Sequence, residues 1–519
     1  MRSIPRGVPG KLNKTVHLAA LLSLSLFWWV MHPAALAVSS ALPQHIRVSF
    51  TENPASTLTI IWQAPVTAAS GRVQYLPAAD YSGSFTGALE VSAFRSEFSS
   101  EYSSFEATLR GLSFNTGYIY RVGEEDAWSE PARFTTAGTG QEFSFLYMGD
   151  IQDGLADWGN MLREVWAENP ELKFILLGGD LINEGNSPDE WQTFFDHASP
   201  VSGSIPLMPA AGNHDDTPLF WNNFALPRNG PTVYTEKIYS FNYANCHFVV
   251  LDSNELGALS PDYGRISSWL LSDLDSCGQR WRVILLHYPP YPVVEDAHSE
   301  NLQENWVPLW EAHGVDLVLS GHQHVYMRSK PLRANQICSD GAGIVYIMGN
   351  AGTKYYTPSS TYDYIACEAS NNSNYQLINI SGDTLTLQSK DQQGNLFDRY
   401  VLHKKTSPAS YILTPAANPA YQSEISPEGI LCMTVNPYMY GLKYFALGIT
   451  PERTHSGTET LVFVHLRNGV QLGLNVSKTD FDLVHSAQAG FNVLPGDTVK
   501  VYIADDLNNT ADFNPTILQ

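Results

Sequence analysis

Charged residues are scarce in this 519-residue sequence, and basic residues are the scarcer kind. Only 16% of the residues are charged, and 30 lysines and arginines stand against 52 acids, which leaves a net charge of −22. So acidic a chain repels nucleic acid and anionic membranes, which disfavours binding to a nucleic acid duplex. Any ligand that carries phosphate would need a strong local positive charge.

Long apolar runs are absent except for residues 18–31, near the N-terminus. This run follows a basic segment and precedes the small residues Ala35-Leu36-Ala37. The pattern predicts a secretory signal peptide over residues 1–37, cut after Ala37. A retained membrane anchor is the alternative, but the run is short for a spanning helix. We therefore expect a secreted, periplasmic or extracellular protein without a membrane span, whose net charge falls to −26 because four basic residues and no acid are removed.

Cysteine is rare as well, with only five, at positions 246, 277, 338, 367 and 432. They lie far apart and form no CxxC pair, so a metal site built from soft thiolate ligands is not expected. An exported protein can form disulfides. Cys338–Cys367 is the first pairing that we consider, although sequence alone does not fix it, and at least one thiol is left over.

Aromatic residues, by contrast, are plentiful at 12%, which together with the few charges favours a folded, β-rich protein. The length favours two to four domains. Between residues 42 and 137, short alternating runs such as HIRVSF and STLTIIWQA are separated by turn residues, which is typical of a β-sandwich. Trp62 is the expected core tryptophan, and Tyr118 the tyrosine that ties a corner. This segment resembles a fibronectin type III-like module.

From residue 142 the pattern changes to alternating strands and helices. The buried strand FSFLYMGD, a helical pattern over residues 155–170 and a second buried strand LKFILLGGD form a βαβ unit. Further buried strands follow, with helical segments at residues 264–276 and 304–314 and a closing antiparallel meander over residues 375–405. We therefore expect an α/β/α sandwich over residues 142–405.

Residues 406–519 return to a β pattern, as in ETLVFVHLRNG and GDTVKVYIADDL. We expect a third, sandwich-like β domain that contains no group of residues typical of catalysis. Its expected role is to pack against its neighbour or to attach the protein to a surface or a protein partner.

The candidate site lies at the ends of the predicted α/β strands, because ligands of an open α/β sheet collect beyond the carboxyl ends of its strands. Five apolar strands end in residues that can bind a metal or transfer a proton: Asp150, Asp180, the run Asn213-His214-Asp215, His287, and the pair His322 and His324. Oxygen and nitrogen ligands without sulfur suit Zn, Mn or Fe.

The pair of histidines in GHQH predicts two metal ions. Alternate residues of an extended tip can reach two ions, and hydrolytic two-metal sites hold their ions about 3.5–4 Å apart. His322 would then serve one ion and His324 the other, with Asp180 as the bridge between them.

This order of motifs closely resembles the calcineurin-like metallophosphoesterase superfamily. GHQHVYMR, HYPPY and the preceding sandwich resemble the purple acid phosphatases in particular, over residues 42–405. The resemblance implies a four-layer α/β sandwich with a dinuclear metal centre. It also implies two ligand sets: Asp150, Asp180 and His324 for one ion, and Asp180, Asn213, His287 and His322 for the other. His214 falls at the family's catalytic histidine, and Asp215 at an acidic residue that orients this histidine.

Two positions depart from this family pattern. Asn183 stands where purple acid phosphatases have the tyrosine whose phenolate binds ferric iron and gives the colour, so a violet centre is not expected. Gln152 stands where the wider superfamily often has a ligating histidine. Its amide oxygen is a candidate ligand of the first metal, and the alternative is a hydrogen bond to a metal-bound water. The identity of the two ions therefore stays open among Fe, Zn and Mn.

We expect in-line attack of a metal-bridging hydroxide on phosphorus, with His214 as the general acid for the leaving oxygen or as a group that stabilises equatorial charge. The alternative is a histidine that only supports the metal ligands. His298, expected on a loop, is a candidate phosphate contact or second proton donor, and the alternative is a solvated loop histidine. Tyr326 and Arg328 are candidates to line the pocket, although a structural ion pair suits Arg328 better. Asn350 is expected to shape the rim.

Three functions stay open on the sequence. The first is an exported phosphatase that acts on small phosphomonoesters. The second is a phosphodiesterase for nucleotides or lipid head groups, which must hold two substituents on phosphorus. The third is a non-catalytic extracellular binding or adhesion protein, and the presence of both Asp180 and His214 argues against it.

Overall fold

The computed structural model describes residues 42–124, 127–138, 140–254, 263–338, 341–358, 362–404, 411–426, 430–451 and 458–504. The predicted signal peptide, residues 1–37, lies outside the described residues. None of the helices in the described ranges is long and apolar enough to cross a membrane.

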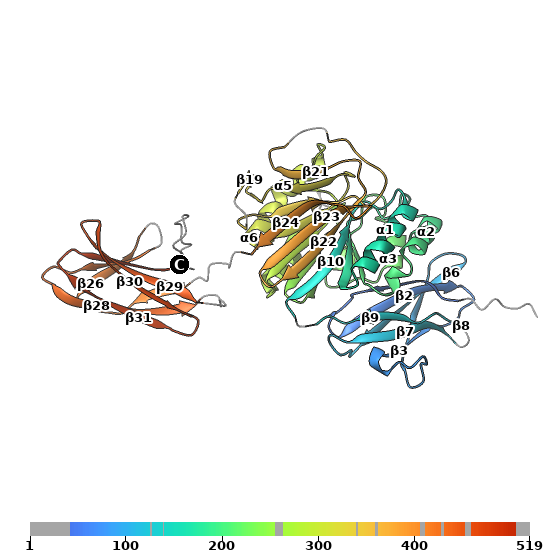
Figure 1. Cartoon of the computed structure of the whole chain (residues 1–519), viewed down its shortest axis with the longest axis horizontal. Coiled ribbons are helices and arrows are strands. Elements are labelled where there is room, and N and C mark those ends of the chain that lie inside the picture. The colour runs from blue at the N-terminus through green and yellow to red at the C-terminus, as the bar shows by residue number, and fades with distance from the viewer. Residues whose placement is uncertain are drawn as a thin grey trace, which may run out of the picture. The chain divides into compact units, whose positions relative to one another are not determined.

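The N-terminal part of the described chain forms two antiparallel sheets (Figure 1). The first has the order β1 (Gln44–Ser49), β2 (Thr57–Pro65), β6 (Tyr102–Arg110) and β5 (Phe94–Glu97). The second has the order β4 (Leu89–Ser92), β3 (Arg72–Pro77), β7 (Gly117–Glu124) and β8 (Ala127–Trp128), with β9 (Ala132–Thr135) also paired to β7.

Two aromatic residues of this part behave as predicted. Trp62 is buried and stacks on Phe105, with the ring centroids 5.5 Å apart. The hydroxyl of Tyr118 accepts a hydrogen bond from the amide of Ser113 at 2.9 Å, so it ties the corner that precedes β7.

A six-stranded sheet begins the α/β part of the chain. Its order is β12 (Leu207–Pro209), β11 (Leu172–Leu177), β10 (Glu142–Met148), β22 (Asn374–Ser381), β23 (Thr384–Asp391) and β24 (Leu396–His403). Strands β10 to β12 run parallel, so their carboxyl ends meet at one edge. Strands β22 to β24 form the antiparallel meander that the sequence predicts.

A seven-stranded sheet completes this part. Its order is β13 (Tyr239–Tyr243), β14 (Cys246–Val250), β15 (Trp281–Leu285), β16 (Leu317–Ser320), β20 (Val345–Met348), β17 (Tyr326–Ser329) and β21 (Ile365–Ala369). Strands β14, β15, β16 and β20 run parallel. A small hairpin, β18 (Leu332–Arg333) and β19 (Gln336–Ile337), follows β17.

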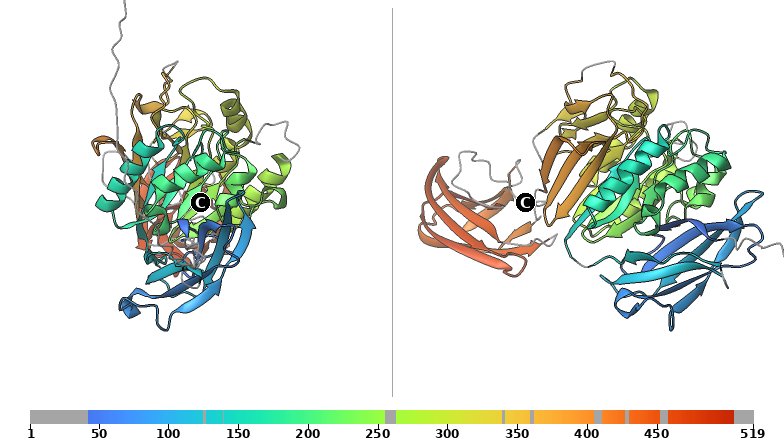
Figure 2. Two further views of the ribbon diagram at one scale, coloured as in Figure 1. Left: turned by 90° about the vertical axis from the view of Figure 1, so that its right-hand side faces the viewer. Right: turned by 45° about the vertical axis from the view of Figure 1, so that its right-hand side comes forward.

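Aromatic rings join the two sheets face to face. Phe145 of β10 and Phe174 of β11 stack at 5.2 Å, and both meet Phe248 of β14 edge-on. The helices α1 (Leu155–Glu168) and α2 (Pro188–Ala198) lie side by side (Figures 1 and 2). The short helix α3 (Pro218–Asn223) follows them in the chain.

The opposite face of the seven-stranded sheet carries a core of its own. Successive residues of a strand point to opposite faces, and Val283 of β15 belongs to the core between the sheets while Ile284 belongs to the outer core. The outer core includes Leu270 of α4 (Tyr263–Ser276) and the buried Trp306 and Trp310.

The helix predicted over residues 304–314 is wrong in its bounds. The structure has two helices, α5 (Ala297–Asn305) and α6 (Val307–Ala312), which meet at Trp306. Pro308 has no amide hydrogen to donate inside a continuous helix, so the chain starts a new helix here. His298 consequently lies in the first turn of α5 and not on the expected loop.

Residues 411–504 contain two further sheets. One has the order β25 (Tyr411–Pro415), β28 (Gly441–Pro451) and β31 (Ser486–Val493). The other has the order β26 (Tyr421–Ile425), β27 (Leu431–Val435), β32 (Thr498–Ala504), β29 (Glu459–Arg467) and β30 (Val470–Thr479). Both sheets contribute to one core, which contains Phe445, Phe463 and Val501.

The disulfide considered between Cys338 and Cys367 is wrong. Cys367 lies in β21, opposite Arg328 of β17, and carries a free thiol. Cys338 follows the β18–β19 hairpin, where its thiol points to the carbonyl oxygen of Pro331 at 3.5 Å. Strand pairing and the hairpin thus give the two thiols separate surroundings.

Candidate metal centre

Five strand tips deliver the candidate site residues. They follow β10, β11, β12, β15 and β16, in this order: Asp150, Asp180, Asn213, His287, and the pair His322 and His324. Four have a left-handed backbone, with φ of 47°, 52°, 75° and 49°: Asp150, Asp180, His322 and His324. Such a conformation costs a non-glycine residue about 1–3 kcal/mol, and it is most common at functional sites.

Two glycines allow these tips to approach one another. A Cβ atom at Gly212 would lie 2.2 Å from Oδ1 of Asp180, and one at Gly321 would lie 2.6 Å from Oδ2 of Asp150. Any side chain at either position would collide with a carboxylate. This contact explains why GNHD and GHQH each begin with glycine.

One group of ligand atoms gathers around Asn213. Its Oδ1 lies 3.1 Å from Nε2 of His287 and 3.1 Å from Nδ1 of His322. Nε2 of His287 is also 3.4 Å from Oδ2 of Asp180. The other ring nitrogen of His287, Nδ1, donates to the carbonyl oxygen of Gly178 at 2.9 Å, which turns Nε2 toward the group. Two carbonyl or carboxylate oxygens and two imidazole nitrogens thus converge, as ligands of one ion would.

A second group shares Asp180 with the first. The ligand atoms of Asp150, Asp180 and His324 lie within 4.8 Å of one another, and so do those of Asp180, His287 and His322. Among the described residues, no hydrogen-bond partner reaches Oδ2 of Asp150 or Nδ1 of His324, although both atoms are buried. A buried carboxylate oxygen without a partner is costly unless a cation meets it. These residues therefore fit a pair of metal ions.

The charges of the two groups perturb one another. Burial and the charge of Asp180 raise the pKa of Asp150, against the effect of His287. Burial alone would raise the pKa of Asp180, but the nearby cation of His287 lowers it. Burial alone would lower the pKa of His287, but the charges of Asp180 and Asp150 raise it. Burial and Lys354 lower the pKa of His324 to about 3, so its ring is neutral, the form that binds metal.

Gln152 and Asn183, the two departures from the family pattern, are hydrogen-bonded to each other. The Asn183 side-chain amide donates to the main-chain oxygen of Gln152 at 3.0 Å. The Gln152 side chain, with its amide oriented to satisfy both neighbours, donates to Oδ2 of Asp180 and accepts from Nζ of Lys354, both at 3.0 Å. Lys354 is a cation that sequence analysis missed, although it follows a strand tip in GNAGTK.

His214 contacts both Asp180 and Asn183. Its main-chain amide donates to Oδ1 of Asp180 at 3.0 Å, and its Nδ1 donates to the main-chain oxygen of Asn183 at 2.9 Å. The expected orienting residue, Asp215, has another task, because its carboxylate accepts from the amides of Leu181 and Gly212 at 2.6 Å each. Asp215 thus fixes the two loops, and the carbonyl of Asn183 orients the imidazole.

His298 reaches the site through Tyr288 and Asp296. Its ring stacks on Tyr288, with centroids 4.0 Å apart, and Tyr288 lies 4.2 Å from the ring of His322. Asp296, the residue before α5, contacts Nδ1 of His298 through Oδ1 and Nε2 of His322 through Oδ2, both at 3.1 Å. Tyr288 and Asp296 are not predicted from the sequence, because nothing in their local sequence indicates their partners.

Three further candidates make structural contacts. Tyr326 is fully buried and donates to Asp398 at 2.6 Å, so it does not line the expected pocket. Arg328 pairs with Asp398 at 2.7 Å, which confirms its structural role. Asn350 is buried beneath the expected rim, where its Nδ2 donates to the carbonyl oxygen of Lys354 at 3.0 Å.

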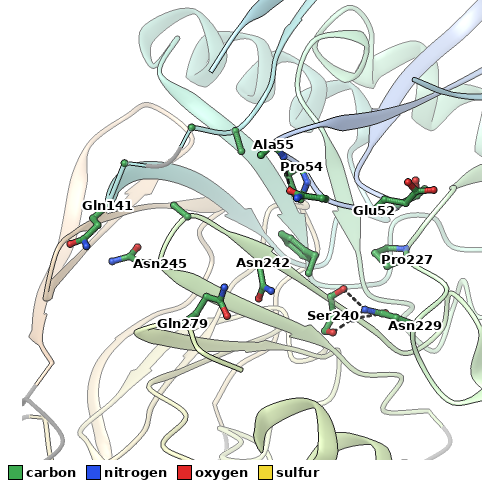
Figure 3. A pocket seen from close by; sticks show the side chains of 17 residues that line it. Glu52, Pro54, Ala55, Gln141, Pro227, Asn229, Ser240, Asn242, Asn245 and Gln279 are labelled. Atoms are coloured by element: carbon green, nitrogen blue, oxygen red, sulfur yellow. Dashed lines mark hydrogen bonds between the residues drawn. The ribbon is translucent and has the colours of Figure 1, made fainter. Parts of the chain in front are cut away.

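A hollow of about 660 Å³ lies away from the strand tips, between the N-terminal sandwich and the β13–β14 hairpin (Figure 3). Its lining includes Glu52, Asn229, Ser240 and Asn242, and none of the predicted site residues. Within the described part of the chain, potential metal ligands gather at the strand tips and not here.

Comparison with known proteins gives two family matches. Residues 143–326 match the family "Calcineurin-like phosphoesterase", and residues 43–136 match "Purple acid Phosphatase, N-terminal domain".

Purple acid phosphatase 18 of Arabidopsis thaliana is 26% identical over 376 residues, which cover 67% of this chain and 79% of the relative. The uncharacterized protein Rv2577 of Mycobacterium tuberculosis is 23% identical over 452 residues, 76% of this chain and 80% of the relative. The structure of purple acid phosphatase PPD1 from yellow lupin seeds has a TM-score of 0.59 at 16% identity, over 70% of this chain and 74% of that one, which shows a common fold.

Proposed function

Because this phosphoester-hydrolysing enzyme joins a purple acid phosphatase N-terminal domain to a calcineurin-like phosphoesterase domain, we propose that it is an exported, dinuclear phosphomonoesterase. The observation that carries the proposal is that Asp180 belongs to two groups of metal ligands at once. A shared carboxylate is what a two-metal hydrolytic site requires.

Asp150, Asp180 and His324 would hold one ion, and Asp180, Asn213, His287 and His322 the other. When bound, two such ions supply a nucleophilic water near neutral pH and neutralise charge on the phosphoryl oxygens. Gln152 would add its amide oxygen to the first ion, which requires its amide to turn away from Lys354. The oxygen and nitrogen ligands suit Zn, Mn or Fe.

His214 is proposed as the general acid. Because Nδ1 donates to the carbonyl oxygen of Asn183, Nε2 is the nitrogen left to protonate a leaving oxygen. His298 is proposed as a contact to the phosphate or the leaving group, since its side chain is 45% exposed beside Tyr288 and the metal ligand His322.

The test compares 4-nitrophenyl phosphate with bis(4-nitrophenyl) phosphate on the metal-loaded protein. We expect faster hydrolysis of the monoester, and a fall in kcat of about 10²–10⁴-fold in His214→Ala with both metals retained. His313→Ala is the control. This histidine follows α6 and pairs with Asp275 of α4, outside both ligand groups. Faster diester hydrolysis would favour the phosphodiesterase alternative, and full activity in His214→Ala would exclude the acid role. Two bound metals without any hydrolysis would favour a binding protein.

The proposed export depends on residues 1–37, and the first residue of the secreted protein tests it. We expect the mature chain to begin at Val38. A protein that keeps its N-terminus and stays with the cells would contradict export. This result would leave the proposed hydrolysis unaffected. The proposed role of the β domain over residues 411–504 is attachment to a surface or to a partner protein.

A further inference from the structure

We infer that Asp296 is a positioning residue that selects which nitrogen of His322 faces the second metal and ties this ligand to His298. The inference rests on the proposed dinuclear site. It deepens that proposal, because it adds a residue that orients one of the proposed metal ligands.

The contacts of His322 divide its two nitrogens between two partners. Nε2 lies 3.1 Å from Oδ2 of Asp296, and Nδ1 lies 3.1 Å from Oδ1 of Asn213. A carboxylate accepts the proton of Nε2, which leaves Nδ1 as a lone pair. This lone pair then faces the Asn213 oxygen with no hydrogen between them, an arrangement that a cation between the two atoms would stabilise.

Other contacts hold the backbone and the faces of the ring but do not select a nitrogen. The main-chain amide of His322 donates to Oδ1 of Asp150 at 2.8 Å. The rings of His287 and Tyr288 lie 5.1 Å and 4.2 Å from the imidazole. A ring held only in this way could still turn over and point a carbon at the metal. The hydrogen bond to Asp296 is what opposes this rotation.

Asp296 is itself fixed in place. It is the N-cap residue of α5, and its Oδ1 accepts from the main-chain amide and from Nδ1 of His298, at 2.8 and 3.1 Å. The same carboxylate therefore caps a helix with one oxygen and holds a proposed metal ligand with the other. It also holds the imidazole of His298 through Nδ1.

A carboxylate behind a metal-binding histidine fixes the tautomer and strengthens the ligand, and its loss typically costs 10–100-fold in metal affinity. The informative variant is Asp296→Asn, because asparagine is also a good N-cap and has the same size. Its amide removes the negative charge and, with its oxygen on the helix cap, presents a donor to Nε2. Glu295→Gln is the matched control, since it removes the same charge from the exposed neighbouring residue.

The experiment titrates the metal-free mature protein and each variant with Co²⁺, followed by visible absorption and by competition with a chromogenic chelator. We expect Asp296→Asn to bind one of two equivalents about 10–100-fold more weakly, with a changed spectrum for that equivalent. The other equivalent, and both equivalents of Glu295→Gln, should match the unmodified protein. His298→Ala should also keep both affinities, because the Asp296–His322 contact does not need the imidazole of His298.

Two results would overturn the inference. If Asp296→Asn binds both equivalents with unchanged affinity and spectrum, Asp296 only caps α5. If both equivalents weaken equally, the substitution disturbs the whole site and selects no nitrogen. A different result, fewer than two equivalents on the unmodified protein, would refute the proposed dinuclear function itself.

Discussion

Two buried carboxylates of this chain have the same chemistry and different surroundings. Asp497, in the β domain over residues 411–504, is 1% exposed and accepts hydrogen bonds from an imidazole, a guanidinium and a main-chain amide at 2.8–2.9 Å. Asp150, at the tip of β10, is fully buried, and one of its oxygens accepts from a main-chain amide at 2.8 Å. No partner reaches its other oxygen within the described ranges.

The difference is the one expected between a structural carboxylate and a proposed metal ligand. Buried polar groups in folded proteins almost always have partners, so a complete set as at Asp497 needs nothing further. Unpartnered buried atoms at two converging strand tips, Oδ2 of Asp150 and Nδ1 of His324, are what a cation site would leave, and perturbed pKa values gather at such sites. The comparison therefore predicts that metal ions bind at Asp150 and Asp180 and that none binds at Asp497.

The largest effect is expected from Asp180→Asn. Loss of the carboxylate shared by both ligand groups should remove at least one of the two metals and lower hydrolysis by about 10³-fold, since metal ions supply several kcal/mol to such reactions. Elemental analysis and aryl phosphate assays measure both. Asp497→Asn is the matched control and should keep two metals and full activity. Two retained metals in Asp180→Asn would contradict the role of Asp180 as a ligand shared by both metals.

Metal binding should also stabilise one region and not the other. At a free metal concentration 100 times Kd, ligation is worth about 2.7 kcal/mol, or about 100-fold slower hydrogen exchange at the strand tips. Hydrogen-exchange mass spectrometry should show this for peptides that contain Asp150, Asp180 and His322. Peptides from β29 and β32 should exchange at the same rate with and without metal. Equal protection in both regions would contradict a local metal site.

The hydrogen bonds that the Asp497 carboxylate accepts should contribute to the stability of the protein. Asp497→Asn should lower the free energy of unfolding by about 2 kcal/mol at pH 7, since hydrogen bonds to charged groups contribute about 1.5–3 kcal/mol. Hydrogen bonding to Arg467 lowers the pKa of Asp497, against the effect of burial. A lowered pKa contributes stability above the unfolded-state pKa of about 4 and loses it as the pH falls further. Urea unfolding should thus show a deficit that shrinks at pH 3, and a constant deficit would contradict this assignment.

The smallest effect is expected from removing the β domain over residues 411–504 altogether. A chain that ends at Lys404 loses the domain around Phe445 and Phe463, which has its own core. We expect kcat/KM on aryl phosphates and metal content to stay unchanged. A fall in kcat/KM with both metals retained would mean that the β domain contributes to the active site.

The sequence predicts where the site lies better than it predicts which partners its residues contact. An apolar run that ends in Asp150 or His287 marks a strand tip, and parallel strands bring such tips to one edge. Asp296 was missed because its partner, His322, is distant in sequence and is set by the fold. The resemblance assigns Asp215 to orient its neighbour His214, but its carboxylate accepts hydrogen bonds from the backbone amides of Leu181 and Gly212.

Local signals were also missed or overruled. Helix α2 has the start signal Ser187-Pro188 with Glu190, and the Ser187 hydroxyl accepts from the Glu190 amide at 3.3 Å. This helix is nevertheless not among those predicted from the sequence. The pattern over residues 304–314 favoured a single helix because its apolar spacing outweighed Pro308, whose missing amide hydrogen divides it.

Metal dependence of the hydrolysis is tested most directly by the metal content of the purified mature protein, measured with its phosphatase activity before and after treatment with a chelator. We expect about two transition-metal ions per chain, loss of hydrolysis when they are removed and recovery when they are returned. A protein that hydrolyses aryl phosphates equally well without metal would contradict this expectation.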